Sequence, residues 1–149
     1  MAWIFIPYEE MSNIHFGQTR DSIEVTLGKP GRVKETYTGK VRLEYGVSMP
    51  AFVFDDGRLV EIGMLPELSE PSEYKDLNLF ALPERDVLRR LERADSNIRE
   101  SNGFILFFGL GIALTGFHDE MGEQKAMAIF SSDHAWIGKS PTMMPISFL

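Results

Sequence analysis

The stretch GFILFFGLGIALTGF, residues Gly103 to Phe117, is the part of this sequence on which the fold depends. Ten of its fifteen residues are aliphatic or aromatic, and the other five are four glycines and one threonine. Such a run could form a membrane-spanning helix, a glycine-rich phosphate-binding loop, or two buried strands around a bend. The three alternatives make different demands on length and on neighbouring residues.

Neither a membrane-spanning helix nor a phosphate-binding loop fits the length and the neighbouring residues of this stretch. A membrane helix needs about 20 apolar residues, and each glycine in a helix interior costs about 1 kcal/mol. A phosphate loop opens a helix and carries Lys and Ser or Thr after its glycines, whereas IALTGF follows here. The pattern therefore predicts strands at Phe104–Phe108 and Ile112–Phe117, with a tight bend or bulge at Gly109–Gly111.

Composition limits the function further. The chain has 149 residues and a net charge of -7. It has no cysteine, so disulfides, a thiol nucleophile and thiolate zinc sites are excluded. The negative charge argues against direct nucleic-acid binding and suits a basic partner. The N-terminus MAWIFIPYEE lacks the basic and apolar regions of a signal peptide. We therefore expect a cytoplasmic protein without a membrane segment.

Two segments, Phe16–Pro30 and Phe80–Asp95, share an amphipathic pattern at an offset of 64 residues. The matched apolar pairs are Phe16 with Phe80, Ile23 with Val87, and Leu27 with Leu91. Each segment predicts a short helix. Thr19 is the expected N-cap of the first, and Gly28 and Pro30 end it. Pro83 is the expected first residue of the second, before acidic residues that favour a helix N-terminus.

The strand segments repeat in the same order. At an offset of 63, the matched residues are Leu43 with Leu106, Tyr45 with Phe108, Gly46 with Gly109, and Phe54 with Phe117. Hairpin turns are expected near Thr38-Gly39 and Asn102-Gly103, and a final strand follows each polar turn, at Arg58–Met64 and Lys125–Ser131. The sequence thus predicts an α+β fold: a tandem duplication of a helix plus a three-stranded antiparallel sheet, with the two sheets joined edge to edge.

The predicted domain organisation follows from this repeat. Residues 1–65 form the first unit with an N-terminal strand, residues 66–76 (PELSEPSEYKD) form a linker rich in Pro, Ser and Glu, and residues 77–149 form the second unit with a C-terminal tail.

Alternation along the strands predicts which side chains face the helices. In the first unit, Val41, Leu43 and Tyr45 are expected to face inward, and Arg42 and Glu44 outward. The aligned residues of the second unit are Phe104, Leu106 and Phe108 inward, and Ile105 and Phe107 outward. An uncovered apolar sheet face marks an interaction site. Either a partner covers Ile105 and Phe107, or the apolar tail Pro141–Leu149 does.

Motifs for catalysis or metal binding are weak. His118, Asp119 and Glu120 are adjacent in a predicted turn and lack the spacing of metal ligands. Ser131, Asp133 and His134 are too close in sequence for a catalytic triad, and G-x-S-x-G and S-x-x-K motifs are absent. A paired-carboxylate hydrolase has no sequence signature and stays open. We expect no enzyme activity, no catalytic residues, no metal and no cofactor.

The first half carries a familiar series of short motifs. A G-x-T start, a helix ending in L-G-x-P and a D-G turn occur at Gly17, Thr19, Leu27, Gly28, Pro30, Asp56 and Gly57. This series resembles the domain of small outer-membrane-assembly lipoproteins, and the tandem arrangement is similar to the β-lactamase-inhibitor-protein fold. The resemblance covers about Ile14 to Met64, and the second half lacks L-G-x-P. It implies a fold that binds and inhibits other proteins.

An acidic cytoplasmic protein of this kind resembles an immunity protein, which neutralises a bacterial toxin delivered by a contact-dependent or type VI secretion system. The negative charge favours a basic toxin such as a nuclease, whose active site the inhibitor would occlude. The expected partner-binding residues are exposed acids beside aromatics: Tyr37, Glu44, Asp55, Asp56, Phe107, Asp119 and Glu120. The alternatives are a non-inhibitory binding or assembly module and a small-molecule binder that uses the cleft between the two units.

Overall fold

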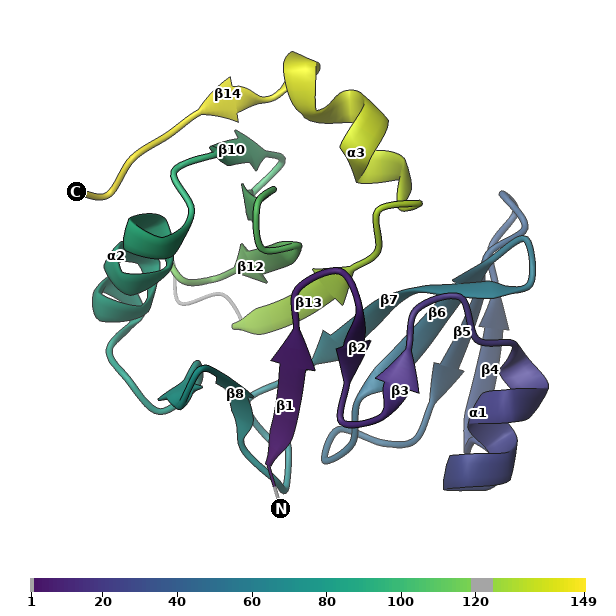
Figure 1. Cartoon of the computed structure of the whole chain (residues 1–149). Helices are drawn as coiled ribbons and strands as arrows, with labels where there is room; N and C mark the ends of the chain where they lie inside the picture. The colour runs from purple at the N-terminus through teal and green to yellow at the C-terminus, as the bar shows by residue number, and fades with distance from the viewer. Residues whose placement is uncertain (1, 119–124) are drawn as a thin grey trace.

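The computed structural model describes residues 2–118 and 125–149 as a mixed α+β structure with two sheets. The larger sheet is antiparallel throughout and has nine strands in the order β14-β10-β11-β12-β13-β7-β6-β5-β4. Helices α1 (Arg20–Leu27) and α2 (Glu84–Ala94) lie on one side of it (Figure 1). Among the described residues, no helix is long and apolar enough to span a membrane.

The strands of the first half follow α1 in direct succession. They are β4 (Arg32–Glu35), β5 (Val41–Glu44), β6 (Ala51–Asp55) and β7 (Arg58–Met64). Asp56 and Gly57 both have positive φ, at 52° and 77°, as a two-residue hairpin turn requires. The predicted helix signals are also confirmed, because the Thr19 side chain accepts a hydrogen bond from the Ser22 N–H and Gly28 ends α1 at a φ of 85°.

The second half has the same order of elements. After α2 come β10 (Ile98–Ser101), β11 (Phe104–Phe107), β12 (Ile112–Thr115) and β13 (Ala126–Phe130). The predicted Asn102-Gly103 turn is confirmed by φ values of 52° and 86°. Each helix is thus followed by four antiparallel strands and not by the three that the sequence predicted. The four-strand segments meet where β7 pairs with β13.

A smaller sheet packs beside the large one. Its strands are β1 (Trp3–Ile6), β2 (Glu10–Met11), β3 (Ile14–His15), β8 (Ser72–Tyr74) and β9 (Leu77–Asn78), in the order β3-β2-β1-β8-β9. Strand β8 lies inside the predicted linker and pairs in parallel with β1. The segment between the halves is therefore part of the folded structure, because it supplies a strand that holds the N-terminus.

The main core lies between the large sheet and the elements that cover its inner face. It contains Ile23 of α1, Leu88 of α2, Phe5 of the small sheet, and the inward-facing residues of β5 to β7 and β11 to β13. Phe107 belongs to this core and is 0% exposed. Burial of each such side chain contributes about 1.5–3 kcal/mol, so this layer holds the two sheets and both helices together.

The predicted orientation of the second unit is wrong by one residue. Ile105 and Phe107 face α2 in the main core, whereas Leu106 and Phe108 belong to a second apolar cluster on the opposite face. Because side chains alternate with a period of two, a shift of one residue reverses every position on a strand. The alignment of Leu43 with Leu106 caused the error, since the offset of 64 used for the helices matches Leu43 with Phe107.

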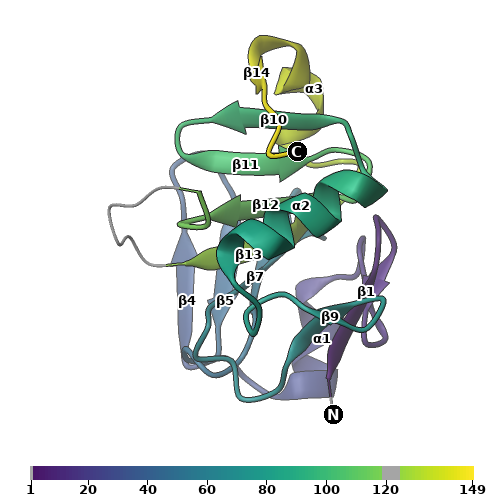
Figure 2. The same cartoon turned by 90° about the vertical axis from the view of Figure 1, so that its left-hand side faces the viewer.

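The C-terminal segment covers the second apolar cluster. Helix α3 (Ala135–Lys139) and the 3-10 turn η1 (Ser140–Thr142) place Trp136, Ile137 and Met143 against it. Strand β14 (Met144–Pro145) then pairs with β10 at the sheet edge (Figure 2). The last residues return to the helix side, where Glu92 accepts hydrogen bonds from Ser147 and Phe148. Neither of the two alternatives for Ile105 and Phe107 applies, because both residues lie in the main core, and the C-terminal segment covers Leu106 and Phe108 on the opposite face.

Candidate functional site

A row of small side chains crosses the open face of the large sheet. Four neighbouring strands, β6, β7, β13 and β12, carry Ala51, Gly63, Ala128 and Ala113 in direct register. Because these side chains barely rise above the backbone, the sheet surface is hollowed along this line. A groove of about 390 Å³ lies over it and over the junction between the two four-strand segments.

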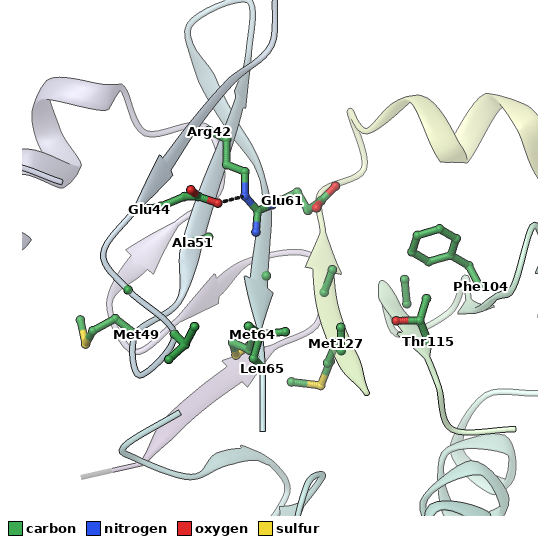
Figure 3. Close-up of a pocket in the computed structure, with 16 residues that line it drawn as sticks. Arg42, Glu44, Met49, Ala51, Glu61, Met64, Leu65, Phe104, Thr115 and Met127 are labelled. Atoms are coloured by element: carbon green, nitrogen blue, oxygen red, sulfur yellow. Dashed lines mark hydrogen bonds and ion pairs between the residues drawn. The ribbon is translucent and has the colours of Figure 1, made fainter. Parts of the chain in front are cut away.

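One end of the groove is apolar. Its lining includes Met49, Leu65 and Phe104, and Val47 is 59% exposed beside them. The Phe104 ring packs against Trp136 of α3 with ring centroids 5.5 Å apart. Figure 3 shows Phe104 and Thr115 across the groove from the charged residues of β5. Met49 is partly exposed there, and a flexible methionine side chain adapts to ligands of different shape, so this end suits an apolar side chain or ligand.

The other end is charged. Arg42 Nε donates to Glu44 Oε2 at 3.0 Å, and Lys34 and Arg32 approach the same carboxylate at 3.8 and 3.9 Å. The hydrogen bond from Arg42 lowers the pKa of Glu44, and the charges of the three cations lower it further. Glu44 is therefore a neutralised carboxylate in a cationic surrounding, which does not match its predicted role as a free acid for a basic partner.

The Arg42 guanidinium lies over the floor of the groove. Its Nη atoms are 3.7 and 3.9 Å from the position that a Cβ on Gly63 would take, and within the described residues only its Nε has a hydrogen-bond acceptor. A guanidinium can bind a carboxylate through two parallel hydrogen bonds. Arg42 can therefore orient an acidic group of a ligand above Gly63.

Glu61 lies between the groove and α3. Its Oε1 is 2.8 Å from Nε2 of the buried His134, whose Nδ1 accepts the Trp136 N–H at 3.0 Å. Because Nδ1 is an acceptor, the hydrogen-bond pattern places the imidazole proton on Nε2, which donates to Glu61. The pair fixes the start of α3 at the edge of the groove. The Ser131 hydroxyl accepts the Asp133 N–H within the turn before α3, and His134 caps that helix, so these side chains are engaged in local structure.

The structure separates the predicted binding residues. Tyr37 is fully exposed, at 103%, in the β4–β5 turn, and the turn with Asp55 and Asp56 lies at the same end of the sheet. The connection between β12 and β13 leaves from the opposite end, because Thr115 pairs with Ala126 beside Met64. Asp119 and Glu120 lie in that connection, outside the described residues.

Phe107 is removed from the candidate site by its burial in the main core. The groove residues Arg42, Gly63 and Ala128 were not proposed as site residues from sequence. The row of small residues has no local signature, since each of its members lies on a different strand. The alternation that placed Arg42 on the open face was the one available signal.

The glycine-rich bend does form an anion site, but for a carboxylate of this chain. Asp95 Oδ2 accepts the N–H groups of Gly109 at 2.7 Å and Leu110 at 3.0 Å, and Oδ1 accepts that of Asn97 at 3.0 Å. The Tyr8 hydroxyl donates to the Phe108 carbonyl in the same bend. Burial raises the pKa of Tyr8 to about 12, and Asp95 adds to the shift. Asp95 and Tyr8 thus hold the backbone of this bend in place through hydrogen bonds.

Metal ligands do not gather in the described part of the chain, where no group of three or more His, Asp or Glu residues could hold an ion. His118 Nε2 lies 3.0 Å from Glu100 Oε2 instead.

Known proteins give no further guide to the site. No family model, curated protein or solved structure matches this chain. The evidence for function is therefore the groove and the distribution of charge around it.

Proposed function

We propose that this chain is a cytoplasmic immunity protein that binds a bacterial toxin domain through the open face of its large sheet. The observation that carries the proposal is the groove over β6, β7, β13 and β12. Its floor of small residues leaves room for a protruding side chain or loop of a partner. An inhibitor of this kind needs no catalytic group, only a rigid surface complementary to the active site that it blocks.

The groove combines features of a protein-binding surface. Phe104 and Met49 offer an apolar contact at one end, and Arg42 with Glu44 forms a polar rim at the other. Helix-backed strands position all of these residues, which lowers the entropic cost of ordering them on binding. The prediction that the toxin is a nuclease rests on the net charge of -7 and on acids outside the groove, because Glu44 is already neutralised.

An internal duplication accounts for the position of the groove. We infer that a helix-plus-four-strand unit was duplicated, which the symmetric order of β10 to β13 and β7 to β4 supports. The units join through their last strands, where Ile62 pairs with Ile129. Gly63 and Ala128 pair beside them, so the groove lies on the axis that would relate the units.

The test is co-expression with each reading frame next to this gene that is toxic when expressed alone. An immunity protein rescues growth and co-purifies one-to-one with the toxin. Ala126→Trp would fill the apolar end of the groove, and we expect it to abolish rescue. Ala94→Trp, on the exposed end of α2, is the matched control and should keep it. Absence of both rescue and complex would refute the proposal.

A small-molecule binder is the second candidate, favoured by the volume of the groove. About 390 Å³ falls within the range of ligand sites, about 300–1,000 Å³. A metabolite that binds there would raise the melting temperature of the protein, and Ala126→Trp would remove that increase. An increase that Ala126→Trp leaves intact would assign the ligand to another site.

A further inference from the structure

The hairpin formed by β4 and β5 differs from the rest of the molecule in exposure. All nine residues from Gly31 to Gly39 are exposed, including both faces of β4. Val33 is 40% exposed and Tyr37, near the tip, is fully exposed. Helix α1 thus leaves this edge uncovered, and Figures 1 and 2 show β4 at the margin of the large sheet. We call residues 29–44 the basic arm.

The charge of the basic arm is opposite to that of the whole protein. It contains five cations, Lys29, Arg32, Lys34, Lys40 and Arg42, and two acids, Glu35 and Glu44. Its net charge is therefore +3, in a chain whose net charge is -7. Arg32, Lys34 and Arg42 gather around the single carboxylate of Glu44 on the open face. An acidic segment of a partner would be attracted to this edge, whereas basic parts of the same partner would be attracted to the rest of the surface.

Strand β4 also offers backbone hydrogen bonds. Among the described residues it pairs with β5 alone, which makes it a free edge of the nine-stranded sheet. Thr36 N–H donates across the hairpin to the Lys40 carbonyl at 2.9 Å. Because backbone groups alternate in direction along a strand, the N–H and C=O groups of Val33 and Glu35 point away from β5. These groups can pair with an added strand.

A second copy of this chain fits the edge poorly. In a two-fold antiparallel pairing of two β4 strands with their open faces on the same side, Arg32 faces Lys34 of the other copy, or Lys34 faces Lys34. Like charges directly opposite each other destabilise strand pairing, and lysines on an edge strand are a known protection against self-association. A strand with acids at alternate positions would instead place a carboxylate opposite each cation.

We propose that the basic arm binds an extended acidic segment of a partner protein, which adds to β4 as a tenth strand of the sheet. Its acidic side chains lie over Arg32 and Lys34, and Tyr37 provides an aromatic contact at the end of the arm. This inference deepens the proposed function, on which it rests for the partner being a protein, and it names an acidic strand as the element that the partner contributes.

The probe is a blocked hexapeptide, acetyl-Thr-Glu-Ile-Glu-Ile-Thr-amide, added to the full ¹⁵N-labelled chain. We expect shifts in the amide signals of β4 and slower hydrogen exchange at Val33 and Glu35, because their N–H groups become hydrogen-bonded. The same peptide with lysines in place of glutamates should bind at least tenfold more weakly. Raising the salt concentration should weaken binding of the acidic peptide, since the ion pairs are exposed.

Two variants and a matched control test the mechanism. Arg32→Gln/Lys34→Gln should lower affinity by about tenfold, the size expected for two exposed ion pairs. Val33→Pro removes an edge donor without breaking a hydrogen bond to β5, and should abolish the exchange protection. Arg85→Gln/Arg90→Gln, on the exposed side of α2, changes the net charge equally and should bind as the wild type does. Unchanged circular dichroism verifies that each variant is folded.

Several outcomes would overturn the proposal. They are a lack of peptide binding, equal binding of the lysine peptide, amide shifts that map away from β4, or preferential binding of a DNA duplex to the arm. The peptide test needs no toxin, so it separates this inference from the proposed function. Rescue without peptide binding would refute the acidic strand alone, and peptide binding without rescue or complex would refute the immunity role.

Discussion

Substituting Gly109 by alanine should destabilise the protein strongly, for a steric reason. A Cβ at this position would lie 2.6 Å from Oδ1 and 2.8 Å from Cγ of Asp95. Its backbone does not have a positive φ, so conformational strain of alanine plays no part. Real Cβ atoms do not approach other atoms this closely, and either the bend or the carboxylate of Asp95 must move.

The magnitude follows from the bonds that the displacement breaks. Asp95 accepts the N–H groups of Gly109 and Leu110 at 2.7 and 3.0 Å, and the residue is only 8% exposed. A hydrogen bond to a charged group contributes about 1.5–3 kcal/mol, so losing both costs about 3–6 kcal/mol. That is a large share of the 5–15 kcal/mol typical of a domain's stability.

Urea unfolding followed by far-UV circular dichroism measures this loss. Gly138→Ala is the control, because a Cβ there meets nothing within 4 Å and alanine favours the helix; its stability should stay equal or rise by up to about 1 kcal/mol. In a double-mutant cycle, Asp95→Ala should absorb most of the cost of Gly109→Ala, since both changes remove the same bonds. A Gly109→Ala protein within about 0.5 kcal/mol of wild type would refute the reasoning.

Three further predictions concern the core, the tail and pH. Phe107→Ala should cost about 3–5 kcal/mol in urea unfolding and the half-exposed Phe104→Ala much less, and equal losses would contradict the assigned faces. Glu92→Ala should speed hydrogen exchange at Phe148 without unfolding the sheet, because it removes the acceptor of that N–H; unchanged exchange would show that the tail is held by its apolar contacts. The raised pKa of Tyr8 gives stability that is complete below pH about 10 and is lost between about 10 and 12, as the hydroxyl ionises more readily in the unfolded chain. Tyr8→Phe should flatten this part of the stability profile, and an identical profile would assign the loss to other groups.

Local signals in the sequence were sufficient for the turns and helix ends. The side chain of Thr19 and the conformational freedom of Gly28 act within a few residues, and so do Asn102 and Gly103 in their hairpin. Each is determined by backbone geometry that neighbours in the sequence set. The order of elements and the α+β class followed from these signals together with the alternating apolar pattern.

Which face of each strand is buried, and what surrounds the candidate site residues, depend on contacts between residues that are distant in the sequence. Aligning Leu43 with Leu106 instead of with Phe107 exchanged the buried and open faces of the second half. Residues near in sequence do not determine which face α2 covers. Glu44 looked like a free acid, yet Arg32 and Lys34 reach it from the neighbouring strand.

The sequence by itself thus determined the two main helices, their turns and the charge of the basic arm, since these depend on residues close along the chain. It did not determine the fourth strand after each helix or the small sheet. Only the tertiary structure decided where the groove lies. Ala51, Gly63, Ala128 and Ala113 are separated by up to 77 positions in the chain and become neighbours through strand pairing alone. The physical reason is that a hollow in a sheet is made by small side chains on adjacent strands, and adjacency of strands is a property of the fold.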